Sequence, residues 1–160
     1  MYKRQEPEFW TNADVADSAS TAITGSSADS FVGYTAASTA AATSALTNVG
    51  RGSGNTATFD MSAGGNNTFV AGDHAAMSSG SLVYTGGSGD DTLTFGADLG
   101  GRRGSVSLDL GGGNNSVVAL NGAASDFGEI VYSGGSGNDS LMFGDGLANS
   151  AGDALSLIHI

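Results

Sequence analysis

A 24-residue repeat is the feature that most constrains the fold of this chain. The segment 86–94, GGSGDDTLT, recurs two periods later as 134–142, GGSGNDSLM, and weaker, partial copies lie at 63–69 and 111–117, which begin at the second position of the motif. The sixth position of each copy is occupied in turn, at a constant step, by Asn67, Asp91, Asn115 and Asp139. A unit this short cannot bury its own apolar face, so the repeat predicts turns that stack on one another.

Two short apolar segments flank each glycine turn. Those ahead of the turn are 82–84, 106–108 and 130–132, and those behind it are 68–70, 92–95, 116–118 and 140–143. They are rich in β-branched and aromatic residues and are bounded by Gly, Asn and Asp, which is typical of strands. Alternation along each strand predicts the inward-facing pairs Leu93 and Phe95, Val117 and Ala119, Leu141 and Phe143, opposite Leu82 and Tyr84, Val106 and Leu108, Ile130 and Tyr132.

The predicted fold class is all-β: a parallel β-roll or β-solenoid with turns of about 24 residues, two strands per turn and a thin core, over residues 49–154. Residues 6–48 are rich in Ala, Ser and Thr and fit the repeat poorly. Within them, 24–32 is a degenerate copy of the motif with a 14-residue offset from the register. We expect decayed turns or an irregular cap there, with a loose segment as the alternative.

Both ends of the chain are expected to derive from a sequencing adapter. Residues 1–5, MYKRQ, and 155–160, LSLIHI, can be encoded by the two strands of one inverted repeat that resembles a transposon adapter. We therefore leave both segments out of the fold prediction.

Composition narrows the possible functions. The chain has no cysteine, which excludes disulfides, thiolate metal sites and a cysteine nucleophile. Its apolar runs are a few residues long, whereas a membrane-spanning helix needs about 20. Five basic and 16 acidic residues give a net charge of −11, which disfavours nucleic acid and favours cations as partners.

The pattern GGxGxDxUx, with U a large apolar residue, resembles the RTX, or haemolysin-type, calcium-binding repeat of secreted bacterial proteins. Segments 86–94 and 134–142 match it in full, and the resemblance covers roughly residues 56–145. It implies Ca²⁺ between successive turns. The implied ligands are the side chains of Asp91 and Asp139, with Asn67 and Asn115 at the same position of the other copies, and the backbone oxygens of Gly87, Gly89, Gly135 and Gly137.

Two departures from the family pattern leave a second interpretation open. A longer loop replaces every second glycine turn, and asparagine alternates with aspartate, so each pair of turns offers one carboxylate. Fewer charges weaken calcium binding. The alternative is that the Asn and Asp column is a metal-free, hydrogen-bonded ladder.

Other candidate residues carry weaker signals. His74 beside Asp73 lacks the partners of a catalytic constellation, so we expect a solvated loop histidine and no enzymatic activity in this chain. Arg102 and Arg103 form a basic pair that we expect to neutralise carboxylates on adjacent turns.

The sequence thus predicts a calcium-responsive structural or adhesive segment of a secreted or cell-surface bacterial protein. Its expected partners are calcium ions and a cell-surface or matrix polysaccharide. One alternative is the secretion and stability module of an exported enzyme whose catalytic domain lies outside this sequence. Another is a metal-free solenoid that adsorbs to ice or polysaccharide through the face bearing Thr92, Thr94 and Ser116.

Overall fold

The computed structural model describes residues 20–24, 30–32, 49–62, 65–150 and 152–157, and the regular elements within these ranges are all strands. One sheet contains β1 (Ser20–Thr24), β3 (Thr56–Asp60), β5 (Ser81–Thr85), β7 (Ser105–Asp109), β9 (Glu129–Ser133) and β11 (Asp153–Leu157). The other contains β2 (Ser30–Val32), β4 (Thr68–Ala71), β6 (Thr92–Phe95), β8 (Ser116–Ala119) and β10 (Ser140–Phe143). No described helix is long and apolar enough to cross a membrane.

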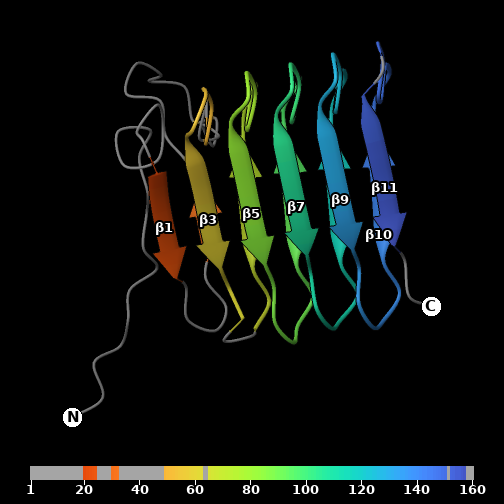
Figure 1. The fold of residues 1–160 in the computed structure, drawn as a ribbon. Helices are drawn as coiled ribbons and strands as arrows, with labels where there is room; N and C mark the ends of the chain where they lie inside the picture. Colours follow the sequence, from red (N-terminus) through yellow and green to blue (C-terminus); the bar gives the residue numbers. More distant parts are fainter. Residues whose placement is uncertain (1–19, 25–29, 33–48, 63–64, 151, 158–160) are drawn as a thin grey trace, which may run out of the picture.

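The described strands pair only in parallel, and the chain winds from one sheet to the other and back (Figure 1). Thr68 pairs with Thr92, Thr92 with Ser116, and Ser116 with Ser140, so each pairing spans one 24-residue step. The step from β3 to β5 is longer by one, because Thr56 pairs with Ser81. The predicted parallel β-solenoid and its 24-residue turns are confirmed.

Two strands extend the stack toward the N-terminus. Ser20 pairs with Thr56 and Ser30 with Thr68, so β1 and β2 form an earlier turn beneath β3 and β4. The interval from Ser30 to Thr68 is 14 residues longer than the 24-residue step. This difference equals the register offset of the degenerate motif copy at 24–32. That offset therefore reflects an insertion between two turns. The other residues of 6–48 lie outside the described part of the chain.

The core is a thin layer between the two sheets, built by alternation along each strand. The predicted inward residues of β5 to β9 are all buried: Leu82, Tyr84, Leu93, Phe95, Val106, Leu108, Val117, Ala119, Ile130 and Tyr132. Leu141 and Phe143 on β10 are partly buried and pack against this core. Burying one such side chain contributes about 1.5–3 kcal/mol, so the stability is a sum over stacked turns.

The outward positions along β4 to β10 of the second sheet carry no charge. Thr92 is exposed, and Thr94, Ser116 and Val118 are half-buried at the outer surface. The Thr-bearing face that the sequence indicated therefore exists, interrupted by aliphatic side chains.

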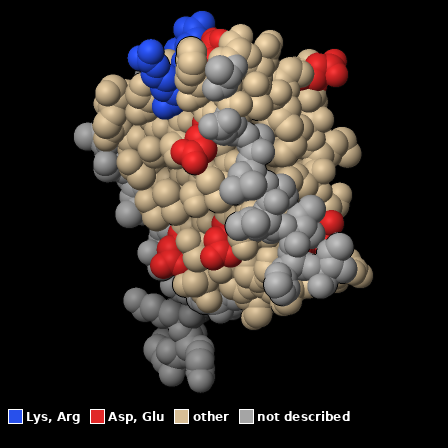
Figure 2. Space-filling view, turned by 45° about the vertical axis from the view of Figure 1, so that its right-hand side comes forward, with Lys and Arg blue, Asp and Glu red and all other residues tan. Residues whose placement is uncertain are grey.

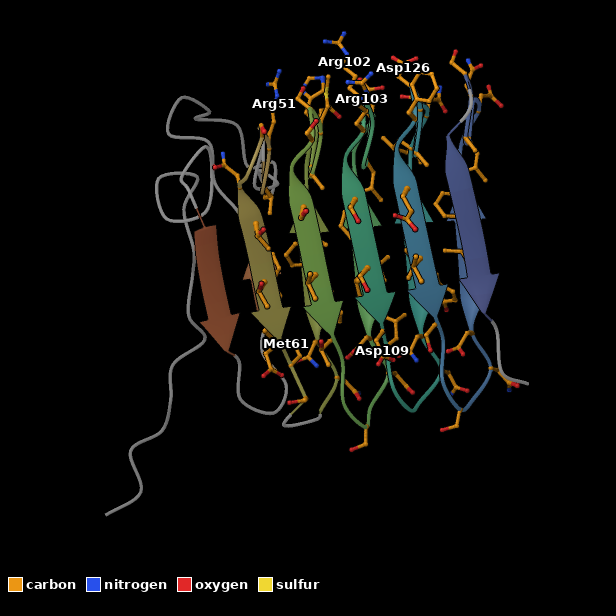
Figure 3. The ribbon with its side chains drawn as sticks, viewed as in Figure 1. Arg51, Met61, Arg102, Arg103, Asp109 and Asp126 are labelled. Atoms are coloured by element: carbon orange, nitrogen blue, oxygen red, sulfur yellow. The ribbon has the colours of Figure 1, made fainter. Side chains whose placement is uncertain are left out.

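Two kinds of connection form the opposite edges of the solenoid. In the described part of the chain, the glycine-turn edge consists of 61–62, 65–67, 86–91, 110–115 and 134–139, and the long-loop edge of 49–55, 72–80, 96–104, 120–128, 144–150 and 152. In Figure 3, Met61 and Asp109 mark the glycine-turn edge, and Arg51, Arg102, Arg103 and Asp126 mark the long-loop edge. At the C-terminal end, Leu155–Leu157 of the expected adapter-derived segment continue β11 and pair with Val131–Ser133.

Candidate functional site

The sixth motif positions form a column inside the glycine-turn edge. Asn67, Asp91 and Asn115 are buried, with 1%, 1% and 2% of their surface exposed, and Asp139 lies half-buried above them. These residues stack because each one immediately precedes a strand of the second sheet, and those strands pair at a constant step. The structure therefore brings together the four side chains that the repeat singled out.

Hydrogen bonds run the length of this column. The backbone nitrogen and the Nδ2 of Asn67 both donate to Oδ1 of Asp91, each at 3.0 Å. The backbone nitrogen of Asp91 donates to Oδ1 of Asn115 at 2.9 Å. Asn115 then repeats the first pattern, because its backbone nitrogen and Nδ2 both donate to Oδ1 of Asp139 at 3.0 Å. Amide donors thus alternate with carboxylate acceptors.

A buried tyrosine approaches the second oxygen of the Asp91 carboxylate. The hydroxyl of Tyr84 donates to Oδ2 of Asp91 at 3.3 Å. Burial raises the pKa of the Asp91 carboxyl, and hydrogen bonds from Asn67 and Tyr84 partly oppose that shift. Burial, reinforced by the Asp91 charge, also raises the pKa of Tyr84, so this side chain stays a neutral donor.

The next tyrosine and carboxylate of the repeat are less fully paired. The hydroxyl of Tyr132 and Oδ2 of Asp139 are buried, and neither has a hydrogen-bond partner among the described residues. Burial, with a smaller contribution from Asp139, raises the pKa of Tyr132 to about 12. This neutral phenol therefore lies beside a carboxylate that has one free oxygen.

The motif glycines stack backbone on backbone. The carbonyl oxygen of Gly87 accepts a hydrogen bond from the nitrogen of Gly112 at 2.7 Å, and the nitrogen of Gly89 donates to the carbonyl of Gly112 at 3.2 Å. Gly135 and Gly137 have φ values of 72° and 124°, and their backbones lie so close to the carbonyls of Gly111 and Gly113 that a Cβ would overlap them. The turns therefore need glycine for two reasons: the positive φ and the close stacking of one turn on the next.

The arrangement leaves few oxygens for a metal ion. Among the described residues, no group of three or more His, Cys, Asp or Glu side chains is placed to hold one. Asp91 and Asp139 are two turns apart, about 9–10 Å along the stack, whereas Ca²⁺ needs six to eight oxygens within roughly 2.6 Å. Two N–H donors already occupy each Oδ1, so a cation here would have to displace them, and calcium binding stays a prediction.

A second column on the surface escaped the sequence analysis. Backbone nitrogens of Asp90, Asn114 and Asn138 donate to the side-chain oxygens of Asn66, Asp90 and Asn114, at 2.9, 2.7 and 3.0 Å. These are the fifth motif positions, and their 24-residue spacing was the available signal.

The candidate histidine lies on the long-loop edge. His74 Nε2 is 3.5 Å from Oδ2 of Asp98, and its side chain is 40% exposed. The neighbouring Asp73 instead accepts a hydrogen bond from the backbone nitrogen of Ala97 at 2.8 Å. His74 thus pairs with the next turn and has no catalytic arrangement around it in the described structure.

Fold and column together define the class of protein: a parallel β-solenoid with an internal Asn and Asp ladder. Comparison with protein-family models, with curated proteins and with solved structures found no match. The resemblance to RTX repeats therefore rests on segments 86–94 and 134–142 and stays a prediction.

Proposed function

We propose that this chain is a structural spacer, a stiff solenoid segment of a larger extracellular protein that keeps its fold without bound calcium. The observation that carries the proposal is the buried column. There the side-chain amides of Asn67 and Asn115 donate hydrogen bonds to the carboxylates of Asp91 and Asp139, which are the groups that a calcium ion would otherwise contact. Such a ladder gives each turn a polar contact with the next that needs no ligand.

The geometry of the stack supports a spacer role. Strands inside the described stack contact the neighbouring turns on both sides, so the segment can lengthen by the addition of turns without a change in its cross-section. Parallel pairing in both sheets resists bending, since any bend must lengthen backbone hydrogen bonds on one side. The resemblance of 86–94 and 134–142 to repeats of secreted bacterial proteins supports an extracellular setting.

Thermal unfolding in calcium and in chelator tests the proposal. A site of 1 mM affinity would add about 1.4 kcal/mol at 10 mM Ca²⁺, which is a rise of roughly 3–6 °C in Tm. We expect the Tm in 10 mM CaCl₂ to match that in EDTA, with MgCl₂ as the control for ionic strength. A calcium-specific rise that disappears in the double variant Asp91→Asn, Asp139→Asn would overturn the proposal in favour of a calcium-responsive segment.

A further inference from the structure

The long-loop edge contains a hollow that the spacer function does not use. It has a volume of about 350 Å³, is open to solvent, and lies across three successive loops. Its lining residues are Ser78, Ser79, Arg102, Arg103, Asp126 and Phe127. Ser78, Arg102 and Asp126 form one column at the 24-residue step, and Ser79, Arg103 and Phe127 form a second column beside it. The repeat itself therefore places a hydroxyl, a guanidinium, and a carboxylate or an aromatic ring next to one another.

The two arginines in this hollow lack a carboxylate partner among the described residues. No ion pair joins Arg102 or Arg103 to a carboxylate there, so the expected neutralisation of adjacent carboxylates is not seen. Asp126 lies on the next turn and lines the same hollow without pairing with them. Figure 2 shows basic side chains gathered at one edge, and Figure 3 shows Arg102, Arg103 and Asp126 there. In a chain of net charge −11, this part of the structure presents two exposed cations that form no ion pair with a described carboxylate.

An aromatic ring completes the hollow. Phe127 is 63% exposed, and the guanidinium carbon of Arg103 lies 5.9 Å from its ring centroid. A ring this exposed stabilises the core little. It orients Arg103 through a cation–π contact and offers a flat apolar surface to a ligand.

The backbone under these side chains is left-handed. All six lining residues have positive φ, between 52° and 64°, although none is glycine. Hydrogen bonds between turns hold this conformation, because the nitrogens of Ser78, Ser79 and Arg103 donate to the carbonyls of Gly101, Arg102 and Asp126 at 3.0 Å. Left-handed conformations cost about 1–2 kcal/mol per residue. Six other non-glycine residues of the long loops share them, so this backbone belongs to the loop geometry of the repeat and places the lining side chains in columns.

We propose that this hollow binds one uronate unit of an acidic polysaccharide. Guanidinium forks match the geometry of a carboxylate, and the face of a sugar ring stacks on an aromatic side chain. The serine hydroxyls can donate hydrogen bonds to sugar hydroxyls or accept them, and the Asp126 carboxylate accepts hydrogen bonds from sugar hydroxyls. Asp126 also lowers the net positive charge of the hollow, which favours a singly charged carboxylate over a doubly charged phosphate. This inference is independent of the spacer function.

The test is a titration of the full chain with trigalacturonate, followed by the amide shifts of residues 78–79, 102–103 and 126–127. Neutral trigalactose and inorganic phosphate are titrated in parallel. We expect saturable shifts with trigalacturonate alone. Arg103→Gln should weaken binding about tenfold, the loss expected for one charge-assisted hydrogen bond, and Phe127→Asn, which tolerates positive φ, should weaken it as well.

Ser107→Asp is the matched control, because Ser107 is exposed on the outer face of β7 and the substitution changes the net charge by the same amount as Arg103→Gln. It should leave the affinity within twofold of wild type. The proposal is overturned if wild-type protein shows no saturable shifts at these residues, if phosphate or trigalactose binds as tightly as trigalacturonate, or if Ser107→Asp and Arg103→Gln weaken binding equally. The wild-type titrations decide the question even where a variant does not fold.

Discussion

At the scale of single residues, the alternation of asparagine and aspartate follows from hydrogen-bonding capacity. An ionised carboxylate only accepts, whereas an asparagine side chain both donates and accepts. Asp91 and Asp139 each receive two donors from the residue one turn below, and Asn115 between them accepts from the backbone of Asp91. Two adjacent carboxylates would leave acceptors facing each other, so the alternation that weakens a calcium site improves the ladder.

We predict that Asp91→Asn leaves the protein as stable as wild type, or more stable by about 1 kcal/mol at pH 7. The Oδ1 of the new asparagine accepts the same two bonds from Asn67, and its Nδ2 can donate to the Tyr84 hydroxyl, which now acts as acceptor. The substitution removes a buried charge without removing the ladder. Urea denaturation measures the difference, and a loss above about 2 kcal/mol would show that the charge itself stabilises the fold.

The difference in stability between wild type and the Asp91→Asn variant depends on pH with a definite sign. The pKa of Asp91 is raised in the folded state, so its contribution to stability is full below the unfolded pKa and is lost as pH rises through the folded pKa. The wild type should therefore approach the variant in stability near pH 3 and fall behind it toward pH 7. A gap that widens on acidification would contradict this assignment.

Adjacent glycines in one turn should respond differently to alanine. Gly113 has φ of 102°, and a Cβ there would overlap the carbonyl oxygen of Gly89. The nearest atom to a Cβ on Gly112 would be Ser136 Oγ at 3.3 Å, the end of a side chain that can rotate away. Serine already occupies the same position in both neighbouring turns, at Ser88 and Ser136. We expect Gly113→Ala to cost about 3 kcal/mol or more, since it adds backbone strain to a steric clash.

Gly112→Ala should stay within about 1 kcal/mol of wild type. Thermal melts of the two variants side by side measure the contrast. Equal losses would mean that the stacking of the turns differs from that in the structure.

At the scale of the strands, aromatic packing concentrates in the first turns of the described core. The Phe69 ring lies 4.5 Å from Phe59, 5.6 Å from Phe95 and 6.0 Å from Tyr84, measured between centroids. At the Phe95 position, alanine and phenylalanine alternate along the stack, because Phe95 pairs with Ala71 on one side and Ala119 on the other, and Ala119 pairs with Phe143. The Phe95 ring therefore fills space that its two small neighbours leave.

We predict that Phe95→Ala destabilises the protein by about 3–5 kcal/mol, because the side chain is fully buried and its neighbours cannot collapse into the space. Thr94→Ala, at the adjacent outward position, is the control and should change stability by about 0.5 kcal/mol or less. Urea midpoints with their slopes measure both. A small effect of Phe95→Ala would contradict a continuous core through β6.

Periodicity in the sequence was sufficient to predict the strands and the column, but not the geometry of the long loops. His74 and Ala76 have positive φ, yet nothing in their side chains indicates it. The only signal was comparison between turns, because Gly100 occupies the position equivalent to Ala76 and has φ of 64°. Likewise β1 and β2 escaped prediction as a regular turn because an insertion interrupts the step between β2 and β4. The direction of the hydrogen bonds in the column depends on rotamers, which a spacing does not specify.

At the scale of the whole molecule, stability in a solenoid is a sum of terms within turns and between neighbours, so it differs along the stack. Strands β6 and β8 each pair on both sides, whereas β10 pairs with β8 alone within the described residues. The β10 side chains are also more exposed, with Met142 at 59%. The C-terminal end of the second sheet should therefore open more readily than its middle.

Native-state hydrogen exchange tests this gradient. We expect the amides of β6 and β8 to exchange at least tenfold more slowly than those of β10, which is a difference of about 1.4 kcal/mol in opening free energy. The contribution of neighbours to this protection should be visible in Phe95→Ala, because loss of the ring weakens the interfaces of β6 with β4 and β8 but leaves β10 paired as before. Protection of β8 should then fall toward that of β10. Uniform protection along the second sheet, with a uniform loss of protection in the variant, would instead mean that the stack unfolds as one cooperative unit. The description of its stability as a sum over neighbouring turns would then be wrong for a solenoid of this length.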